Sequence, residues 1–195
     1  MPQLNHSSHF KTYRLAYMGV LAALSLILVA LIHFPIFPAA PYLEYDMADV
    51  PIVLCSFLFG PWAGLALTAV VSVLQWLLIS PQSQVWGAIM HFCATGVLVL
   101  FTGCMYRKHK TKKRAGLSLI LGAVGMVLIM IPLNLLITPI YSGMPVDSVA
   151  GLLVPILIPF NAIKAGINAV LSFFLYKPLS RTIKKIDQKL FKQPT

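Results

Sequence analysis

Residues 38 to 51 read Pro-Ala-Ala-Pro-Tyr-Leu-Glu-Tyr-Asp-Met-Ala-Asp-Val-Pro and separate two strongly apolar segments. Three of the five acidic residues of the chain, Glu44, Asp46 and Asp49, lie in this stretch. Proline and aspartate interrupt helices and tyrosine favours the headgroup region of a bilayer, so an interfacial turn is one interpretation. A cluster of carboxylates and tyrosines also fits a lid over a polar ligand, which is the role we predict.

Composition identifies the whole chain as an integral membrane protein. Of its 195 residues, 58% are hydrophobic and only 10% are charged, and the mean hydropathy is +0.84. A soluble domain has about 25% charged residues. The apolar segments are long and continuous, whereas the strands of a membrane barrel alternate apolar and polar residues over about 10 positions. We therefore predict an all-α membrane protein in which residues 1–195 form a single domain.

The apolar segments predict six transmembrane helices, the second of them short. Residues 50–80 would form a helix of roughly 46 Å, too long for a hydrocarbon core of about 30 Å. Gly60-Pro61, a turn signal, lies near the middle of this region and divides it into two spans. The predicted spans cover about residues 13–33, 48–59, 62–80, 85–106, 117–138 and 151–176.

The positive charges determine the predicted orientation. With six crossings, the Lys and Arg residues before the first span, in the 107–114 loop and in the tail after residue 176 fall on one side, and four of the five acids fall on the other. The positive-inside rule then places the N- and C-termini in the cytoplasm. The net charge of +10 thus follows topology in the lipid bilayer, and we expect no nucleic-acid partner.

Lys164 is the most informative single residue, because it lies at least six positions from either end of the last predicted span. A charge at that depth costs about 3 kcal/mol or more and usually faces a cavity or a partner. Asn161 and Asn168 lie three and four residues away, near the same helix face. Asn134 and Thr138 reach a similar depth in the fifth span. These residues predict a polar pocket, although amides can also serve only to join helices.

The polar groups indicate the kind of ligand. Two amides and an ammonium suit a flat heterocycle with alternating carbonyl and N–H groups, because an amide both donates and accepts. Carboxylates and tyrosines at the outer rim suit a hydroxyl-rich tail and disfavour free phosphate. Four aromatic residues are candidates for stacking on the ring, although each is also typical of interface anchors and packing: Trp76, Trp86, Phe92 and Tyr141.

The first span carries a stripe of small residues, Ala16, Gly19 and Ala23. Such a stripe allows another helix to approach closely, and this helix could belong to the same chain or to a partner. The sequence has no GxxxxGK[ST], HExxH or Gly-x-Ser-x-Gly motif, so we expect no ATPase, metal or catalytic site in this chain. For His91 we predict a helix–helix hydrogen bond. A polar pocket without an energy source suggests a binding subunit that partners power.

Two segments carry a resemblance to a known family: Glu44-Tyr-Asp-Met-Ala-Asp-Val-Pro51 and Phe59-Gly-Pro-Trp-Ala-Gly64. With the six-span layout, Asn134 and Asn161-x-x-Lys164, the chain resembles the substrate-binding S components of energy-coupling factor (ECF) transporters. Within that family it is most similar to the riboflavin-specific type. The resemblance extends over about residues 10–180.

The resemblance implies high-affinity riboflavin uptake across a bacterial plasma membrane. The implied ring contacts are Asn134, Asn161 and Lys164, and the implied tail contacts are Glu44, Tyr45 and Asp46. The stripe of Ala16, Gly19 and Ala23 would dock on a transmembrane coupling protein that works with two ATP-binding-cassette ATPases. Riboflavin would be the transported ligand, and no cofactor is expected. Three alternatives stay open: an S component for another vitamin, one for a flavin such as FMN, and a stand-alone facilitator.

Overall fold

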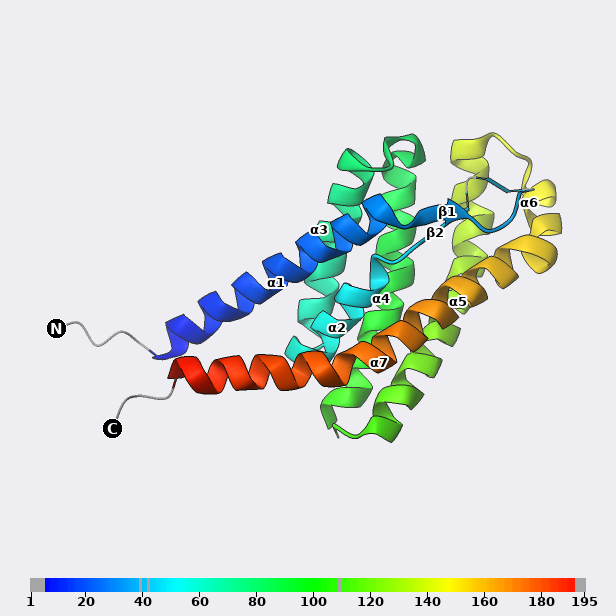
Figure 1. The fold of residues 1–195 in the computed structure, drawn as a ribbon. Coiled ribbons are helices and arrows are strands. Elements are labelled where there is room, and N and C mark those ends of the chain that lie inside the picture. Colours follow the sequence, from blue (N-terminus) through cyan, green and yellow to red (C-terminus); the bar gives the residue numbers. More distant parts are fainter. Residues whose placement is uncertain (1–5, 39, 42, 109, 192–195) are drawn as a thin grey trace.

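The computed structural model describes residues 6–38, 40–41, 43–108 and 110–191, and helices dominate the fold (Figure 1). The helices are α1 (His6–Leu31), α2 (Asp49–Phe59), α3 (Pro61–Leu78), α4 (Gln84–Lys108), α5 (Lys112–Ser142), α6 (Val146–Leu152) and α7 (Ile158–Phe191). Four short elements join them: strands β1 (His33–Pro35) and β2 (Glu44–Asp46), a 3₁₀ turn (Pro81–Ser83) and a π-helical turn (Leu153–Leu157).

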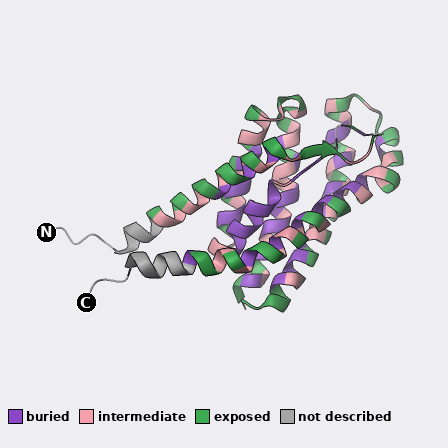
Figure 2. Ribbon diagram, in the orientation of Figure 1, coloured by how far each residue is buried: buried purple, intermediate pink, exposed green. Residues whose placement is uncertain are grey.

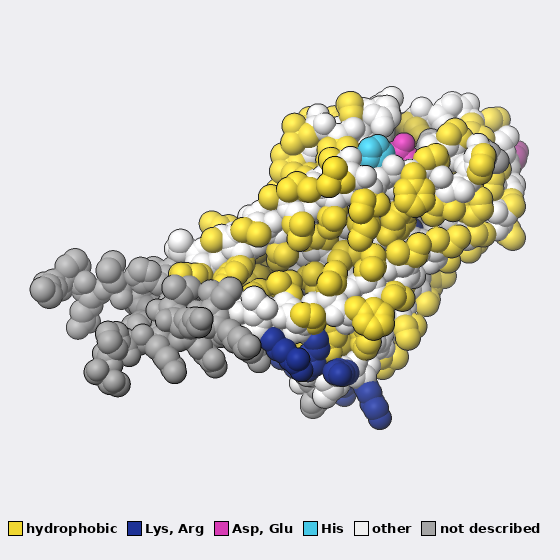
Figure 3. Space-filling model, in the orientation of Figure 1, with side chains coloured by type: hydrophobic (Ala, Val, Ile, Leu, Met, Phe, Trp, Pro, Cys, Tyr) yellow, Lys and Arg dark blue, Asp and Glu magenta, His cyan; other side chains and the backbone are white. Residues whose placement is uncertain are grey.

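Five segments within the described chain are long and apolar enough to cross a membrane. They are Thr12–Leu31, Pro61–Leu78, Pro81–Lys108, Lys112–Ser142 and Val146–Ile183. Hydrophobic side chains cover the flanks of the bundle between its two ends (Figure 3). α2 is different, because its 11 residues extend only about 16 Å, against a hydrocarbon core of about 30 Å. The helix bundle of a membrane protein is therefore present, with α2 too short to cross by itself.

α2 lies at the centre of the bundle. It contacts α1, α3, α4 and α7, and nine of its 11 residues are buried. Figure 2 shows the buried residues concentrated in α2 and the parts of its neighbours that face it, whereas α1 is mostly exposed. The core packs Ile52 and Val53 of α2 with Val71, Leu98 and Val99 of α3 and α4.

Gly60 separates α2 from α3. Its φ of +94° is a conformation that glycine adopts at little cost, and Pro61 occupies the first position of α3, where its missing N–H is not needed. The two helices therefore run antiparallel, as the Gly60-Pro61 signal predicts. Gly64 permits their close approach, because a Cβ there would lie 2.7 Å from the Cβ of Ser56.

The segment between α1 and α2 contains a short β-hairpin that the all-α prediction lacks. β1 and β2 are antiparallel. The paired residues are His33 with Asp46, Phe34 with Tyr45 and Pro35 with Glu44. Pro35 and Pro38 prevent this segment from continuing α1, and two extended strands satisfy each other's backbone groups by pairing.

The connection between the predicted spans 117–138 and 151–176 is mostly helical, because α5 continues to Ser142 and the chain leaves the helical conformation only at 143–145. Pro139 does not end α5, and Ser142 Oγ donates to the carbonyl oxygen of Thr138 at 2.6 Å within the last turn. Gly143, with a φ of +70°, ends the helix. A π-helical turn at Leu153–Leu157 then leads into α7, which extends beyond residue 176 to Phe191.

The close packing of α4 against α2 and α3 at Gly103 can be tested by substitution. A Cβ at position 103 would overlap Ser56 Oγ and lie 2.7 Å from the backbone nitrogen of Pro61. We expect Gly103→Ala to lower stability by about 1–3 kcal/mol through overpacking, despite the higher helix propensity of alanine. The control is Gly116→Ala, where the nearest atom, Phe173 Cε2, is 3.5 Å from the added Cβ. Thermal unfolding in detergent measures both, and equal melting temperatures would contradict the packing.

Candidate functional site

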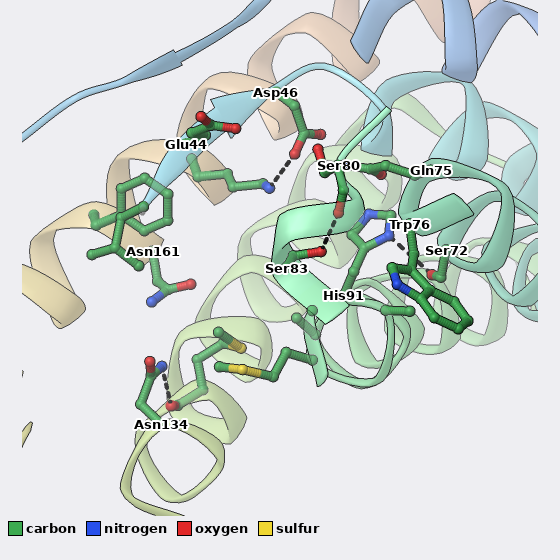
Figure 4. A pocket seen from close by; sticks show the side chains of 18 of the residues that line it. Glu44, Asp46, Ser72, Gln75, Trp76, Ser80, Ser83, His91, Asn134 and Asn161 are labelled. Carbon is green, nitrogen blue, oxygen red and sulfur yellow. Dashed lines mark hydrogen bonds and ion pairs between the residues drawn. The ribbon is translucent and has the colours of Figure 1, made fainter. Parts of the chain in front are cut away.

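A cavity of about 240 Å³ lies beneath the hairpin, between α3, α4, α5 and α7. Figure 4 shows side chains entering it from several sides: Glu44 and Asp46 from the hairpin, Trp76 and His91 from α3 and α4, and Asn134 and Asn161 from α5 and α7. Met90, Met126 and Met130 also line the cavity. The cavity thus combines a few polar groups with apolar surface, as small-molecule sites do.

The structure brings five of the seven predicted binding residues to the cavity wall. These are Glu44, Asp46, Asn134, Asn161 and Lys164. Tyr45 and Thr138 are not among the lining residues, since both side chains are buried in contacts behind the wall. Of the four aromatic candidates, Trp76 and Tyr141 line the cavity, whereas Trp86 and Phe92 do not.

Lys164 and Asp46 form an ion pair across the cavity. Lys164 Nζ donates to Asp46 Oδ2 at 2.7 Å, and both residues are buried. The other carboxylate oxygen, Oδ1, accepts from the backbone N–H of Ala48 at 3.0 Å. Removing two charges from water costs several kcal/mol for each ion, so such a pair persists only when it is well bonded. The pair therefore fastens the hairpin to α7.

The two pocket asparagines are anchored on their own helices. Asn134 Nδ2 donates to the carbonyl oxygen of Met130, and Asn161 Nδ2 donates to that of Leu157, each at 2.8 Å. Thr138 Oγ1 donates to Asn134 Oδ1 at 3.1 Å, so Thr138 orients Asn134 from behind the wall. An asparagine amide has two donors and two acceptor lone pairs, so each side chain keeps groups that can bind a ligand.

Asp49 forms the centre of a buried hydrogen-bond cluster that the sequence pattern alone did not predict. It is fully buried at the start of α2. Thr95 Oγ1 donates to its Oδ1 at 2.6 Å, and His91 Nε2 lies 3.1 Å from the same oxygen. Asn168 Nδ2 donates to Oδ2 at 3.0 Å. One feature of the sequence could have indicated this cluster. His91 and Thr95 lie four residues apart on one helix face, and buried donors at these positions need an acceptor.

Asn168 connects the Asp49 cluster to the hairpin. Its Nδ2 also lies 3.2 Å from the backbone oxygen of Asp46, and its Oδ1 accepts from the hydroxyl of Tyr45 at 3.0 Å. Asn168 therefore holds both the backbone and a side chain of the hairpin at the Asp49 cluster.

The prediction that His91 makes helix–helix hydrogen bonds is confirmed. Its Nδ1 lies 2.9 Å from Ser72 Oγ of α3, and its Nε2 contacts Asp49 of α2. The chain of Ser72, His91 and Asp49 has the composition of a hydrolase triad, but Ser72 lies within α3, whose backbone N–H groups are committed to the helix. The hydrogen bonds of His91 to Ser72 and Asp49 join α2, α3 and α4 beside the cavity.

Comparisons with known proteins agree on one family. A family model for the substrate-specific component of ECF transporters matches residues 13–176. The riboflavin transporter FmnP of Bacillus subtilis is 31% identical over 90% of this chain and 96% of its own length. The riboflavin transporter RibU of Streptococcus thermophilus is 29% identical over 90% of this chain and 86% of its own length. A solved S component of a bacterial ECF transporter matches with a TM-score of 0.77 and 30% identity, covering 89% of this chain and 99% of that one.

Asn168→Ala is expected to destabilise the fold by about 2–4 kcal/mol, because buried groups of Asp49, Asp46 and Tyr45 lose a partner. Ser172→Ala is the matched control: Ser172 lies one turn further along α7 and is buried, and its hydroxyl bonds to no residue in the described part of the chain. Its removal should change stability little. Thermal unfolding of the two variants would refute the anchoring role if the melting temperatures were the same.

Proposed function

Because the chain belongs to the substrate-specific component family of ECF transporters, we propose that it binds riboflavin outside the cell and delivers it for uptake as a transport subunit. The observation that carries this proposal is the cavity, in which Asn134, Asn161 and Lys164 converge beneath a hairpin that supplies two carboxylates. The riboflavin transporters FmnP and RibU are similar to this chain over 90% of its length, which supports the choice of ligand.

The cavity's chemistry suits the isoalloxazine ring. This ring carries alternating carbonyl and N–H groups along one edge, which two amides and an ammonium can bind together. Trp76 and Tyr141 offer aromatic faces, and Met126 and Met130 offer polarizable sulfur, which makes favourable contacts with rings. Uncharged hydroxyls of a ribityl tail can donate to Glu44 and Asp46 at the hairpin. The role of Tyr45 in this proposal is indirect, through Asn168.

Ligand binding and lid position are coupled through Lys164 in this proposal. Asp46 binds the Lys164 ammonium from the hairpin side, and a ligand carbonyl would bind the same ammonium from the cavity side. An ammonium has three donors, so one lysine can hold the lid carboxylate and the ligand together. Riboflavin therefore favours the closed hairpin, which excludes water from the bound ring.

Six crossings with both termini in the cytoplasm follow if α2 and the hairpin together count as the second crossing. Lys and Arg side chains gather toward the end where α4 meets α5, and acidic side chains appear near the opposite end (Figure 3). The positive-inside rule assigns the basic end to the cytoplasm. The cavity then opens toward the outside, from which the vitamin is captured.

The energy for uptake would come from partners, a transmembrane coupling protein and two ATP-binding-cassette ATPases. We assign docking to the stripe of Ala16, Gly19 and Ala23, which is exposed along α1. No atom lies within 4 Å of a Cβ built at Gly19, so no neighbouring helix of the described chain packs on that position. Small exposed residues permit a partner helix to approach the α1 backbone closely.

The direct test is riboflavin binding to the purified protein. We expect a yellow preparation from riboflavin-supplied cells and quenching of flavin fluorescence.

Lys164→Ala should raise the dissociation constant for riboflavin about tenfold or more, because a charge-assisted hydrogen bond is lost. Lys177→Ala, further along α7 and outside the cavity lining, is the control. Asn161→Ala should also weaken binding and removes only one bond to its own helix. Unchanged affinity in folded Lys164 and Asn161 variants would rule out this pocket.

Docking is tested by adding bulk to the stripe. Gly19→Leu should abolish uptake in cells that contain the partners and leave riboflavin binding to the isolated chain unchanged, because position 19 has open space around it. Gly151→Leu adds the same bulk at another open position, on α6, and should leave uptake intact. A Gly19 variant that loses binding and uptake to the same degree would show that the stripe serves the fold of this chain.

A further inference from the structure

A second cavity, of about 390 Å³, lies at the basic end of the bundle. It is formed where the start of α1, the turn between α2 and α3, and the end of α4 meet. Its charged lining residues are Arg14, Arg107 and Lys110, and none of the described residues that line it is acidic. This cavity is separate from the hairpin cavity, since the two share no lining residue.

The three cations are arranged to attract an anion. Arg14 Nη2 donates to the carbonyl oxygen of Phe59 at 3.0 Å, and its guanidinium lies 5.9 Å from the centre of the Phe59 ring. These contacts fix Arg14 at the cavity wall and leave further guanidinium N–H groups available. Arg107 and Lys110 are exposed and form no ion pair with any residue that the structure describes. Like charges brought together without carboxylates repel one another, and a bound anion relieves that repulsion.

The position of the cavity indicates that the anion belongs to a lipid. Arg14 lies near the start of the apolar segment Thr12–Leu31, and Arg107 lies near the end of the segment Pro81–Lys108. Both cations are therefore at the level of the phospholipid headgroups. Trp62, which lines the cavity, is 71% exposed, and tryptophan favours this interface.

The surface beside the cavity suits acyl chains. α1 exposes Leu15, which follows Arg14 directly. A soluble anion, such as inorganic phosphate, would use the cations but gain nothing from this apolar surface. A protein partner with acidic side chains would have to cover the same apolar positions within the bilayer. The combination of cations, an interfacial tryptophan and lipid-facing apolar residues fits a phospholipid best.

We propose that this cavity binds the phosphate headgroup of an anionic phospholipid, with the acyl chains lying against α1. Arg14, Arg107 and Lys110 contact the phosphate, and Trp62 packs beside the headgroup. The lipid joins the start of α1 to the α2–α3 turn, and so it stabilises the helix that carries the exposed stripe. The inference does not depend on which vitamin occupies the other cavity.

The test is a lipid titration of the delipidated full-length chain in detergent, followed by native mass spectrometry. Phosphatidylglycerol should bind more tightly than phosphatidylcholine, and high salt should weaken only the former. Arg107→Gln with Lys110→Gln should weaken phosphatidylglycerol binding about 30-fold, because two interfacial charges are lost. Lys112→Gln with Lys113→Gln is the matched control, since it removes the same charge from exposed positions outside the cavity lining. Circular dichroism verifies that both double variants are folded.

Four outcomes would overturn the proposal. Equal losses in the two double variants would show that diffuse charge attracts the lipid and that the cavity has no special role. Competition by millimolar inorganic phosphate with phosphatidylglycerol would identify a site for free anions. Retained lipid binding in the Arg107/Lys110 variant, with loss of assembly with the partner subunits, would identify the cavity as a protein contact. A salt-independent affinity in the unmodified chain would also exclude an electrostatic headgroup site.

Discussion

The burial of the Asp49 carboxylate is the constraint on which this bundle depends. A carboxylate removed from water loses several kcal/mol of hydration, and only well-placed donors offset that loss. Here the donors are Thr95 and Asn168, with His91 beside the same group. Thr95 and His91 belong to α4, and Asn168 belongs to α7. A shift of either helix by one residue would rotate its side chain by about 100° and remove it from Asp49. The position of α2 against both helices is therefore fixed by polar contacts as well as by packing.

The same contacts unite the cavity wall and the lid. Asn168 binds Asp49, the backbone of Asp46 and the hydroxyl of Tyr45, and one turn away Lys164 binds the Asp46 side chain. The base of the hairpin is thus held at α7 by two adjacent turns. In the proposed function, a ligand that reaches Lys164 therefore contacts the same side chain that holds the hairpin carboxylate.

Local spacing predicted much of the site, and long-range contacts explain what it did not predict. Lys164 and Asn161 share a helix face, so a charge deep in a span with an amide three residues away was enough to indicate the pocket wall. Asp49 was interpreted only as part of the acidic stretch predicted to form a lid, because Asn168 and Thr95, its donors, lie 119 and 46 residues away. The hairpin was missed because three-residue strands leave no period in the sequence. Thr138 was predicted at the ligand from its depth in the span and Tyr45 from the family resemblance, and neither argument separates residues of the cavity wall from those that lie behind it.

The short length of α2 explains how a polar cavity exists within membrane depth. An α-helix that crosses the hydrocarbon core needs about 20 residues, and α2 has 11. In the proposed six-crossing arrangement, the hairpin and the cavity occupy the missing length beyond Asp49. A full-length helix would fill that space with apolar side chains and would leave Lys164 without a partner. The free-energy cost of burying the lysine charge would then have no compensating contact. Shortening one helix therefore leaves room for the cavity, and the buried Asp49 at its first turn fixes where the helix begins.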